Sequence, residues 1–189
     1  MDNGKMDGFC QIVANYGSYI QYYQSDIPNY WTYAQQFALA DNMFSSLTGA
    51  SFGNHLYLVA ATSNEFVTNP KFPHGPDGTY WGCDAPSDTT AARIPNPAKS
   101  QKFKWIYPCM EATTLSDLLD GAGLSWHHYA PSEGQPGYIW SFFDSVPHIR
   151  FGSEWATNVT APQNFITDLQ NNTLANFTWI TRPGEDPGW

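Results

Sequence analysis

Charged residues are scarce in this sequence, and basic residues are the scarcest of them. The chain has 8 Lys and Arg against 17 Asp and Glu, which gives a formal net charge of −9. Proteins that bind nucleic acids carry clustered basic side chains, so this composition excludes a nucleic-acid partner. An acidic chain also repels anionic substrates unless a cation or a group of amide donors offsets its field.

Long apolar runs are also absent. The longest, residues 56–61, is far shorter than the roughly 20 residues that a helix needs to span a bilayer. The first residues, MDNGKMDGF, contain neither the basic segment nor the apolar segment of a secretory signal. The sequence therefore predicts no transmembrane segment, and no signal peptide is visible in this chain.

Cysteine is the third scarcity. The chain has three cysteines, Cys10, Cys83 and Cys109, and no two of them form a C-x-x-C motif. The small number and wide spacing exclude a disulfide-rich scaffold and a cysteine-based zinc site. Two states remain open for them. Either Cys83 and Cys109 form one bridge in an oxidising compartment and Cys10 stays free, or all three are free thiols.

Hydrophobic residues, by contrast, make up 42% of the chain and aromatic residues 16%, so a packed domain is expected rather than disorder. The length of 189 residues predicts a single domain spanning residues 1–189. Within it, residues 69–104 are rich in Pro, Gly, Asp and Thr and show no sustained periodicity, which predicts an irregular loop excursion.

Apolar periodicity predicts the regular elements. We expect helices over residues 26–42, 54–63, 113–123 and 161–172, and strands over residues 43–47, 124–131 and 174–181. In the second half of the chain a helix is twice followed closely by a strand. This order indicates an α/β fold in which helices sandwich a largely parallel sheet.

The segment TGASFGNHLYLVAATS places a lone serine, Ser51, between two glycines just before an apolar helix. The residues GASFG fit G-x-S-x-G, the nucleophile elbow of serine esterases. Such an esterase needs an acid and then a histidine later in the chain. The candidates are Asp117, Asp120 or Asp144, followed by His148.

The position of Ser51 equally suits a phosphate site. A hydroxyl group at a helix N-terminus lies where unpaired amides and the helix dipole attract an anion. Asn54, one helical turn further along, could donate to a non-bridging phosphate oxygen. The alternative is that Ser51 and Asn54 only cap the helix. In this chemistry divalent metals activate the hydroxyl group, and they would also offset the negative net charge.

Several longer segments point to one family. They are NGKMDGF, IPNYWTYAQQFALADNMFSS, GNHLYLVAATS, CDAP, PCMEATTLSDLLDGAGLSWHHYAP, GQPGYIW and HIRFGSEWATNV. In this order, and over most of the chain, they resemble the phosphoesterase family of bacterial phospholipases C and acid phosphatases, relatives of the alkaline-phosphatase superfamily. The resemblance implies an alkaline-phosphatase-like α/β sandwich that is incomplete at both ends in this chain.

The resemblance also implies roles for matched residues. Ser51 falls on the family's nucleophile, Asn3 on a phosphate-contacting asparagine, and Asn54 on the asparagine of the turn after the nucleophile. Ala50 and Gly53 stand where the family has prolines, which would loosen this loop.

His148 and Arg150 lie in another matched segment, where they would either contact a phosphate or a headgroup or form a structural ion pair. The family's metal-binding residues have no counterpart here, so no metal ligand is assigned in this chain. We therefore expect an internal fragment of a longer protein, and a divalent metal ion as the cofactor of the complete protein.

These features predict a phosphoric ester hydrolase of phospholipase C or acid phosphatase type. Its substrate would be a phospholipid or a phosphate monoester, attacked by Ser51 with the help of the metal ion. The resemblance suggests a secreted or periplasmic protein. Two alternatives stay open: a metal-independent serine esterase that uses the GASFG segment, and a catalytically inert binding fragment.

Overall fold

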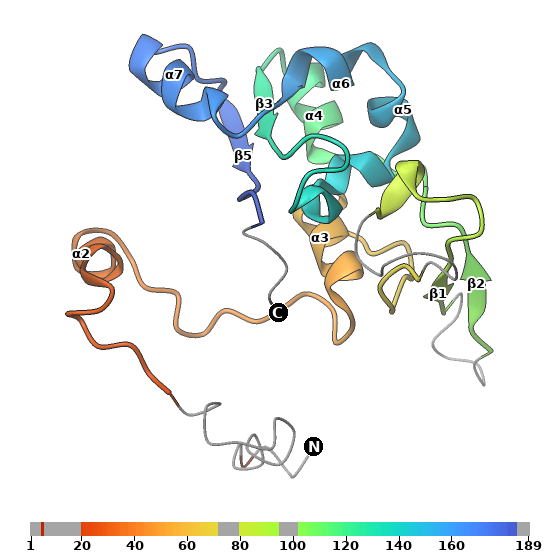
Figure 1. Ribbon diagram of the computed structural model, residues 1–189, viewed down its shortest axis with the longest axis horizontal. Helices are drawn as coiled ribbons and strands as arrows, with labels where there is room; N and C mark the ends of the chain where they lie inside the picture. Colours follow the sequence, from red (N-terminus) through yellow and green to blue (C-terminus); the bar gives the residue numbers. More distant parts are fainter. Residues whose placement is uncertain (1–4, 6–19, 72–79, 95–101, 185–189) are drawn as a thin grey trace. The chain divides into compact units, whose positions relative to one another are not determined.

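The computed structural model describes residues 5, 20–71, 80–94 and 102–184 (Figure 1). The chain divides into two compact units, Met1–Phe44 and Ser45–Trp189, and each unit is described by itself. Asn3, one of the predicted phosphate contacts, lies outside the described residues.

Helix α2, Pro28–Gln36, belongs to the first unit. Pro28 occupies the first turn, where a missing N–H is tolerated because it has no intrahelical acceptor. The helix predicted over residues 26–42 is confirmed in its first part only, because Phe37 leaves helical geometry with φ −120° and ψ −96°. No residue of α2 is buried.

A three-stranded parallel sheet lies in the second unit. The strands, from one edge to the other, are β4, Val159–Thr160, then β3, Trp126–Tyr129, then β5, Phe177–Ile180. His128 of β3 is opposite Val159 and Trp179. The strands predicted over 124–131 and 174–181 and their parallel pairing are confirmed within shorter bounds. The two residues of β4 are too few to carry a periodic signal.

A separate antiparallel pair joins β1, Ala91–Arg93, to β2, Lys104–Ile106. β1 lies in the segment expected to be an irregular loop, as does the 3-10 helix η3, Gly82–Asp84. Three residues give too short a pattern to predict a strand, and β1 is specified by its pairing with β2.

The disulfide between Cys83 and Cys109 is present, with an S–S distance of 2.01 Å. It links η3 to the segment that follows β2, so the bridged alternative for these two cysteines is confirmed. The two cysteines are 26 residues apart in sequence, and closing a loop of this length stabilises the fold by about 3.5 kcal/mol.

The remaining elements of the second unit are helical. They are α3, Ser51–Ala60; α4, Leu115–Gly121; η4, Tyr138–Trp140; η5, Phe142–Ser145; α5, Pro147–Arg150; α6, Ser153–Asn158; and α7, Asn164–Asn171. The helices predicted over 113–123 and 161–172 are confirmed within shorter bounds as α4 and α7. No helix among the described residues has the length and apolarity that crossing a membrane requires.

Two predictions near Ser51 are corrected. The helix expected over 54–63 begins earlier, at Ser51, and ends at Ala60 because Ala61 adopts a left-handed conformation with φ 52°. Residues 43–47, predicted as a strand, are irregular over 43–45 and bend over 46–47. No described segment pairs with them, and a strand without a ladder partner is not stable.

Aromatic side chains build the core against the sheet. The Trp126 ring lies 5.1 Å from the ring of Phe143 and 6.0 Å from that of Trp179. A second buried cluster holds Phe52 and Leu56 of α3. Because these two side chains anchor one face of α3 in the core, the first residue of the helix is left at the surface.

Candidate active site

Ser51 is the first residue of α3, and it is exposed. The preceding residue, Ala50, is extended and offers no side-chain cap. Gly53 is required for packing, because a Cβ atom there would lie 2.8 Å from the carbonyl oxygen of Phe66. Ser51 has no left-handed φ, and the described residue before it is not in a strand. The strained strand–turn–helix geometry of a nucleophile elbow is therefore not formed.

Two asparagines satisfy the polar groups around the start of α3. Asn69 Oδ1 accepts the backbone N–H of Phe52 at 2.9 Å. Asn54 Nδ2 donates to the carbonyl oxygens of Leu47 at 3.1 Å and Ala50 at 3.3 Å, and its Oδ1 accepts the N–H of Leu47 at 3.1 Å. The predicted phosphate contact at Asn54 is thus bonded to its own loop, and the helix begins without help from the serine hydroxyl.

His55 lies one turn after Ser51 on the same helix. Its Nδ1 atom is 3.1 Å from Ser51 Oγ and 2.9 Å from the Ser51 carbonyl oxygen. When Nδ1 carries a proton it donates to the carbonyl oxygen, and when it does not it accepts the hydroxyl proton. Sequence reasoning did not pair these residues, although the i, i+4 spacing on one helix was a usable signal.

His148 is held between two carboxylates. Its Nδ1 is 2.6 Å from Glu111 Oε2, and its Nε2 is 3.0 Å from Asp117 Oδ1. Partial burial opposes protonation, but the hydrogen bonds and negative charges of the two carboxylates outweigh it and raise the pKa of His148. Together with Ala112 and Thr113, these three residues line an open hollow.

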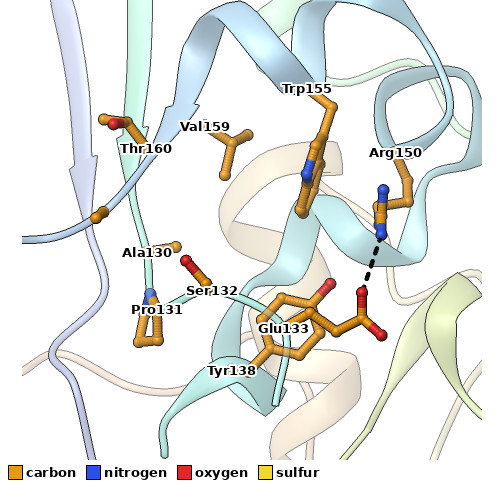
Figure 2. A pocket seen from close by; sticks show the side chains of 10 residues that line it. Ala130, Pro131, Ser132, Glu133, Tyr138, Arg150, Trp155, Val159 and Thr160 are labelled. Carbon is orange, nitrogen blue, oxygen red and sulfur yellow. Dashed lines mark ion pairs between the residues drawn. The ribbon is translucent and has the colours of Figure 1, made fainter. Parts of the chain in front are cut away.

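Arg150 lines a different hollow, shown in Figure 2. Its Nε donates to Asp84 Oδ2 at 2.7 Å, and its Cζ lies 4.6 Å from the centre of the Trp155 ring. Its Nη2 is 3.6 Å from Glu133 Oε2, the ion pair drawn in the figure. The Tyr138 hydroxyl also donates to Asp84. Arg150 is therefore fixed by one half-buried carboxylate and one aromatic face.

A second aspartate lies behind this contact. Asp144 is 2% exposed, and its Oδ1 is 3.7 Å from Arg150 Nε. Burial and, after it, the negative charge of Asp84 raise the pKa of Asp144 to about 9. At neutral pH Asp144 is therefore protonated, and the carboxylate that contacts the guanidinium group at hydrogen-bond distance is that of Asp84.

The predicted site residues thus fall into three places. Ser51 contacts His55, His148 contacts its two carboxylates, and Arg150 lines the hollow of Figure 2. Ser51 lines neither hollow. The Asp117–His148 pair of the predicted esterase triad is present, but both ring nitrogens of His148 contact carboxylates. The contact between Ser51 and His148 that a triad needs is not formed.

A metal site would need several carboxylate, histidine or cysteine side chains directed at one point. In the described part of the chain, no group of three or more His, Cys, Asp or Glu side chains is placed to hold a metal ion. The carboxylates near Arg150 and His148 are instead engaged with these cationic side chains. The described residues therefore do not fit the divalent metal expected from the resemblance.

The family is shown by comparison with known proteins. The family described as "Phosphoesterase family" matches residues 1–188, so the chain belongs to the phosphoesterase family. Two curated relatives are Phospholipase C B of Mycobacterium tuberculosis strain CDC 1551 / Oshkosh and Phospholipase C B of strain ATCC 25618 / H37Rv. Each is 24% identical to this chain over 168 residues, which cover 84% of this chain and 27% of the relative. The chain thus spans about a quarter of their length, and no solved structure matches it significantly.

Proposed function

We propose that the complete protein is a phosphoric ester hydrolase of phospholipase C type and that Ser51 is its nucleophile. Family membership supports the reaction class, and the name of the curated relatives supports the lipid substrate. The observation that carries the role of Ser51 is its exposed hydroxyl group at the start of α3, where Asn69 performs the capping and His55 Nδ1 lies 3.1 Å from Oγ.

The chemistry at Ser51 follows from this position. The dipole and first amides of a helix favour a negatively charged phosphate group. Ser51 Oγ attacks phosphorus, the bond between phosphorus and the diacylglycerol oxygen breaks, and diacylglycerol leaves while the phosphorylated headgroup stays attached to Ser51. Water then attacks phosphorus, releases the phosphorylated headgroup and restores the serine. His55 is within reach to accept the hydroxyl proton during the attack.

Several finer expectations accompany this proposal. An alkaline-phosphatase-like completion of the sheet, metal dependence, and a phosphate monoester as the substrate alternative remain predictions. So do the roles of Asn3, Asn54, His148 and Arg150 in substrate binding. Because the described residues do not fit a metal ion, no step above is assigned to one. Secretion or export to the periplasm is supported by the Cys83–Cys109 disulfide, because such bridges persist in oxidising compartments.

A second candidate function is a metal-independent serine esterase. The observation that favours it is the same distance of 3.1 Å between Ser51 Oγ and His55 Nδ1, which resembles a nucleophile and its base. It differs from the predicted triad because His55 replaces His148 as the partner of the serine.

Labelling by a fluorophosphonate probe, mapped by mass spectrometry, tests both candidates. We expect modification at Ser51 and none at Ser153, a matched serine that is also exposed and also begins a helix, α6. Turnover of the phosphodiester 4-nitrophenylphosphorylcholine supports the phosphoric ester hydrolase. Turnover of the carboxylic ester 4-nitrophenyl butyrate supports the esterase.

The variants complete the test. Ser51→Ala should abolish labelling and turnover, whereas Ser153→Ala should change neither. His55→Gln should slow labelling if Nδ1 accepts the proton. Near-normal turnover in Ser51→Ala would contradict the role of Ser51 in both functions. Absence of labelling and turnover in the unmodified protein would favour the inert binding fragment.

A further inference from the structure

The hollow shown in Figure 2 lies where two neighbouring parallel strands end. Ala130 directly follows β3, and Thr160 is the last residue of β4. The volume of the hollow is about 310 Å³, which is large enough for a small ligand. Crevices outside the carboxyl ends of parallel strands are the places where open α/β sheets bind their ligands.

One cationic group is presented to this hollow in a fixed orientation. The Arg150 side chain is 19% exposed, and its Nε is bonded to Asp84, whose side chain is 10% exposed. The Trp155 ring covers the guanidinium group from a second direction. Little side-chain entropy remains to be lost when a ligand binds to Arg150, and a planar guanidinium group can contact two oxygens of one anion.

The Nη2 group of Arg150 makes only a weak contact, with the exposed side chain of Glu133. Glu133 Oε2 is 3.6 Å from Nη2, which is longer than a hydrogen bond. The Glu133 side chain is 57% exposed, and ion pairs of this kind contribute little stability. An anion that approaches to normal hydrogen-bond distance would therefore replace Glu133 at low cost, and Glu133 would turn to solvent.

The walls of the hollow suit the rest of an organic anion. Val159, Ala130 and Pro131 provide apolar contact, and Thr160 lies beside them. Thr160 Oγ1 accepts a hydrogen bond from Asn164 Nδ2 at 2.6 Å, so its own proton can be donated to a ligand oxygen.

We propose that the hollow lined by Arg150, Glu133 and Thr160 binds a phosphate or carboxylate group on the Arg150 guanidinium group, and that Glu133 is the carboxylate which this anion displaces. The site is distinct from Ser51, which does not line the hollow, and it does not depend on the proposed function. Glu133 acts as a competitor that weakens binding of every anion and so sets the affinity of the site.

Isothermal titration of the 189-residue chain with inorganic phosphate tests the site. Glu133→Gln should tighten binding about fivefold, because it removes a like charge about 4 Å from the bound anion. Glu65→Gln is the matched control, because Glu65 pairs with Arg93 at 2.9 Å outside the hollow and the change in net charge is the same. Arg150→Lys should weaken binding about tenfold, because an ammonium group cannot reproduce the planar fork.

Three results would overturn the proposal. Equal tightening in Glu133→Gln and Glu65→Gln would show a general effect of net charge. Unchanged affinity in an Arg150→Lys variant that unfolds at the wild-type temperature would remove the arginine from the site. If Arg150→Lys does not fold, Glu133→Gln decides, because Glu133 is exposed and its loss leaves the core intact. Loss of phosphate binding in Ser51→Ala would place the anion at Ser51 instead, which would support the proposed function and contradict this site.

A second experiment distinguishes a lipid headgroup from a soluble phosphate as the source of the anion. Sedimentation with phosphatidylcholine vesicles that contain phosphatidic acid presents the same phosphate chemistry as a headgroup. Stronger sedimentation of Glu133→Gln than of Glu65→Gln would support the site with a lipid headgroup as its ligand. Tightening by Glu133→Gln toward free phosphate alone would support it with a soluble phosphate as its ligand.

Discussion

Helices α3 and α4 both begin beside a hydroxyl group, yet the two hydroxyl groups are used in opposite ways. Thr114, the N-cap of α4, is 1% exposed and bonds with its own helix. Its Oγ1 accepts the N–H of Asp117 at 3.3 Å and donates to Asp117 Oδ2 at 2.7 Å, and the same Oδ2 accepts the N–H of Thr114 at 2.6 Å. This is a complete capping box.

At α3 the capping comes from outside the helix start. Asn69, which is 17 residues further along the chain, accepts the N–H of Phe52, and Ser51 stays exposed with His55 near its hydroxyl group. A hydroxyl group at a helix start is thus structural when the helix needs it for capping. The hydroxyl group is available for chemistry when another residue accepts the hydrogen bonds of the first backbone N–H groups of the helix.

The largest expected effect is on catalysis at α3. In the complete protein, Ser51→Ala should lower turnover of a phosphate ester about a thousandfold or more, because no other group replaces the nucleophile. The free energy of unfolding should change by less than about 0.5 kcal/mol, because the hydroxyl is exposed and caps nothing. Steady-state kinetics and urea unfolding of the same preparation check both parts. A large loss of stability would show that Ser51 caps α3 after all.

The opposite result is expected at α4. Thr114→Ala should destabilise the fold by about 2 kcal/mol, because it removes the capping bonds and leaves the N–H of Asp117 without its partner. The neighbouring Thr113, which is exposed, provides the control through Thr113→Ala. Urea unfolding measures the difference. Equal stability of the two variants would contradict a structural role for the buried hydroxyl.

A third substitution, at Asn69, tests both the capping of α3 and the reactivity of Ser51. Asn69→Ala should cost about 1 kcal/mol, the usual value for a lost cap, because Phe52 N–H loses its acceptor. It should also slow fluorophosphonate labelling of Ser51, since the start of α3 is less well fixed. Unfolding curves and labelling rates are the measurements. Normal labelling in a destabilised protein would separate the cap from the reactivity of the serine.

The smallest expected effect is on the pH dependence of stability, through Asp117 in the first turn of α4. Burial alone would raise the pKa of Asp117, but hydrogen bonds from Thr114 and the charge of His148 outweigh it, so the pKa lies below its ordinary value of 3.8. The stabilisation from Asp117 is therefore fully present above pH 3.8 and is lost as the pH falls through the lower, folded-state value. Unfolding midpoints measured from neutral to acid pH should fall less steeply for Asp117→Asn than for the wild type. Identical pH profiles would contradict this sign.

Local signals account for what could be predicted. The sequence TTLSDLLDGAG has its cap, its apolar face and its stop within a few residues, so α4 was predicted correctly. Ser51 was recognised as a candidate for the same reason, because small residues stand directly before an apolar helix. The contact between Ser51 and His55 was also readable, because it needs only helical spacing.

Contacts between distant segments could not be predicted in this way. Asp84 and Arg150 are 66 residues apart, and nothing in either neighbourhood signals the other. His148 and Arg150 stand close together in sequence and were expected to share a substrate. The structure instead directs them to different hollows, because each meets carboxylates of different segments.

The amino-acid sequence by itself determined the family, the parallel order of β3 and β5, the helices α4 and α7, and the candidate serine. These depend on interactions between residues close in sequence, or on sequence motifs that occur in the same order as in the family. Only the tertiary structure decided that Asn54 and Asn69 hold the start of α3, that His148 is bonded to carboxylates, and that Arg150 faces a hollow of its own. Each of these depends on which distant segments meet in the packed core, and pairing at a distance leaves no periodic trace in a single sequence.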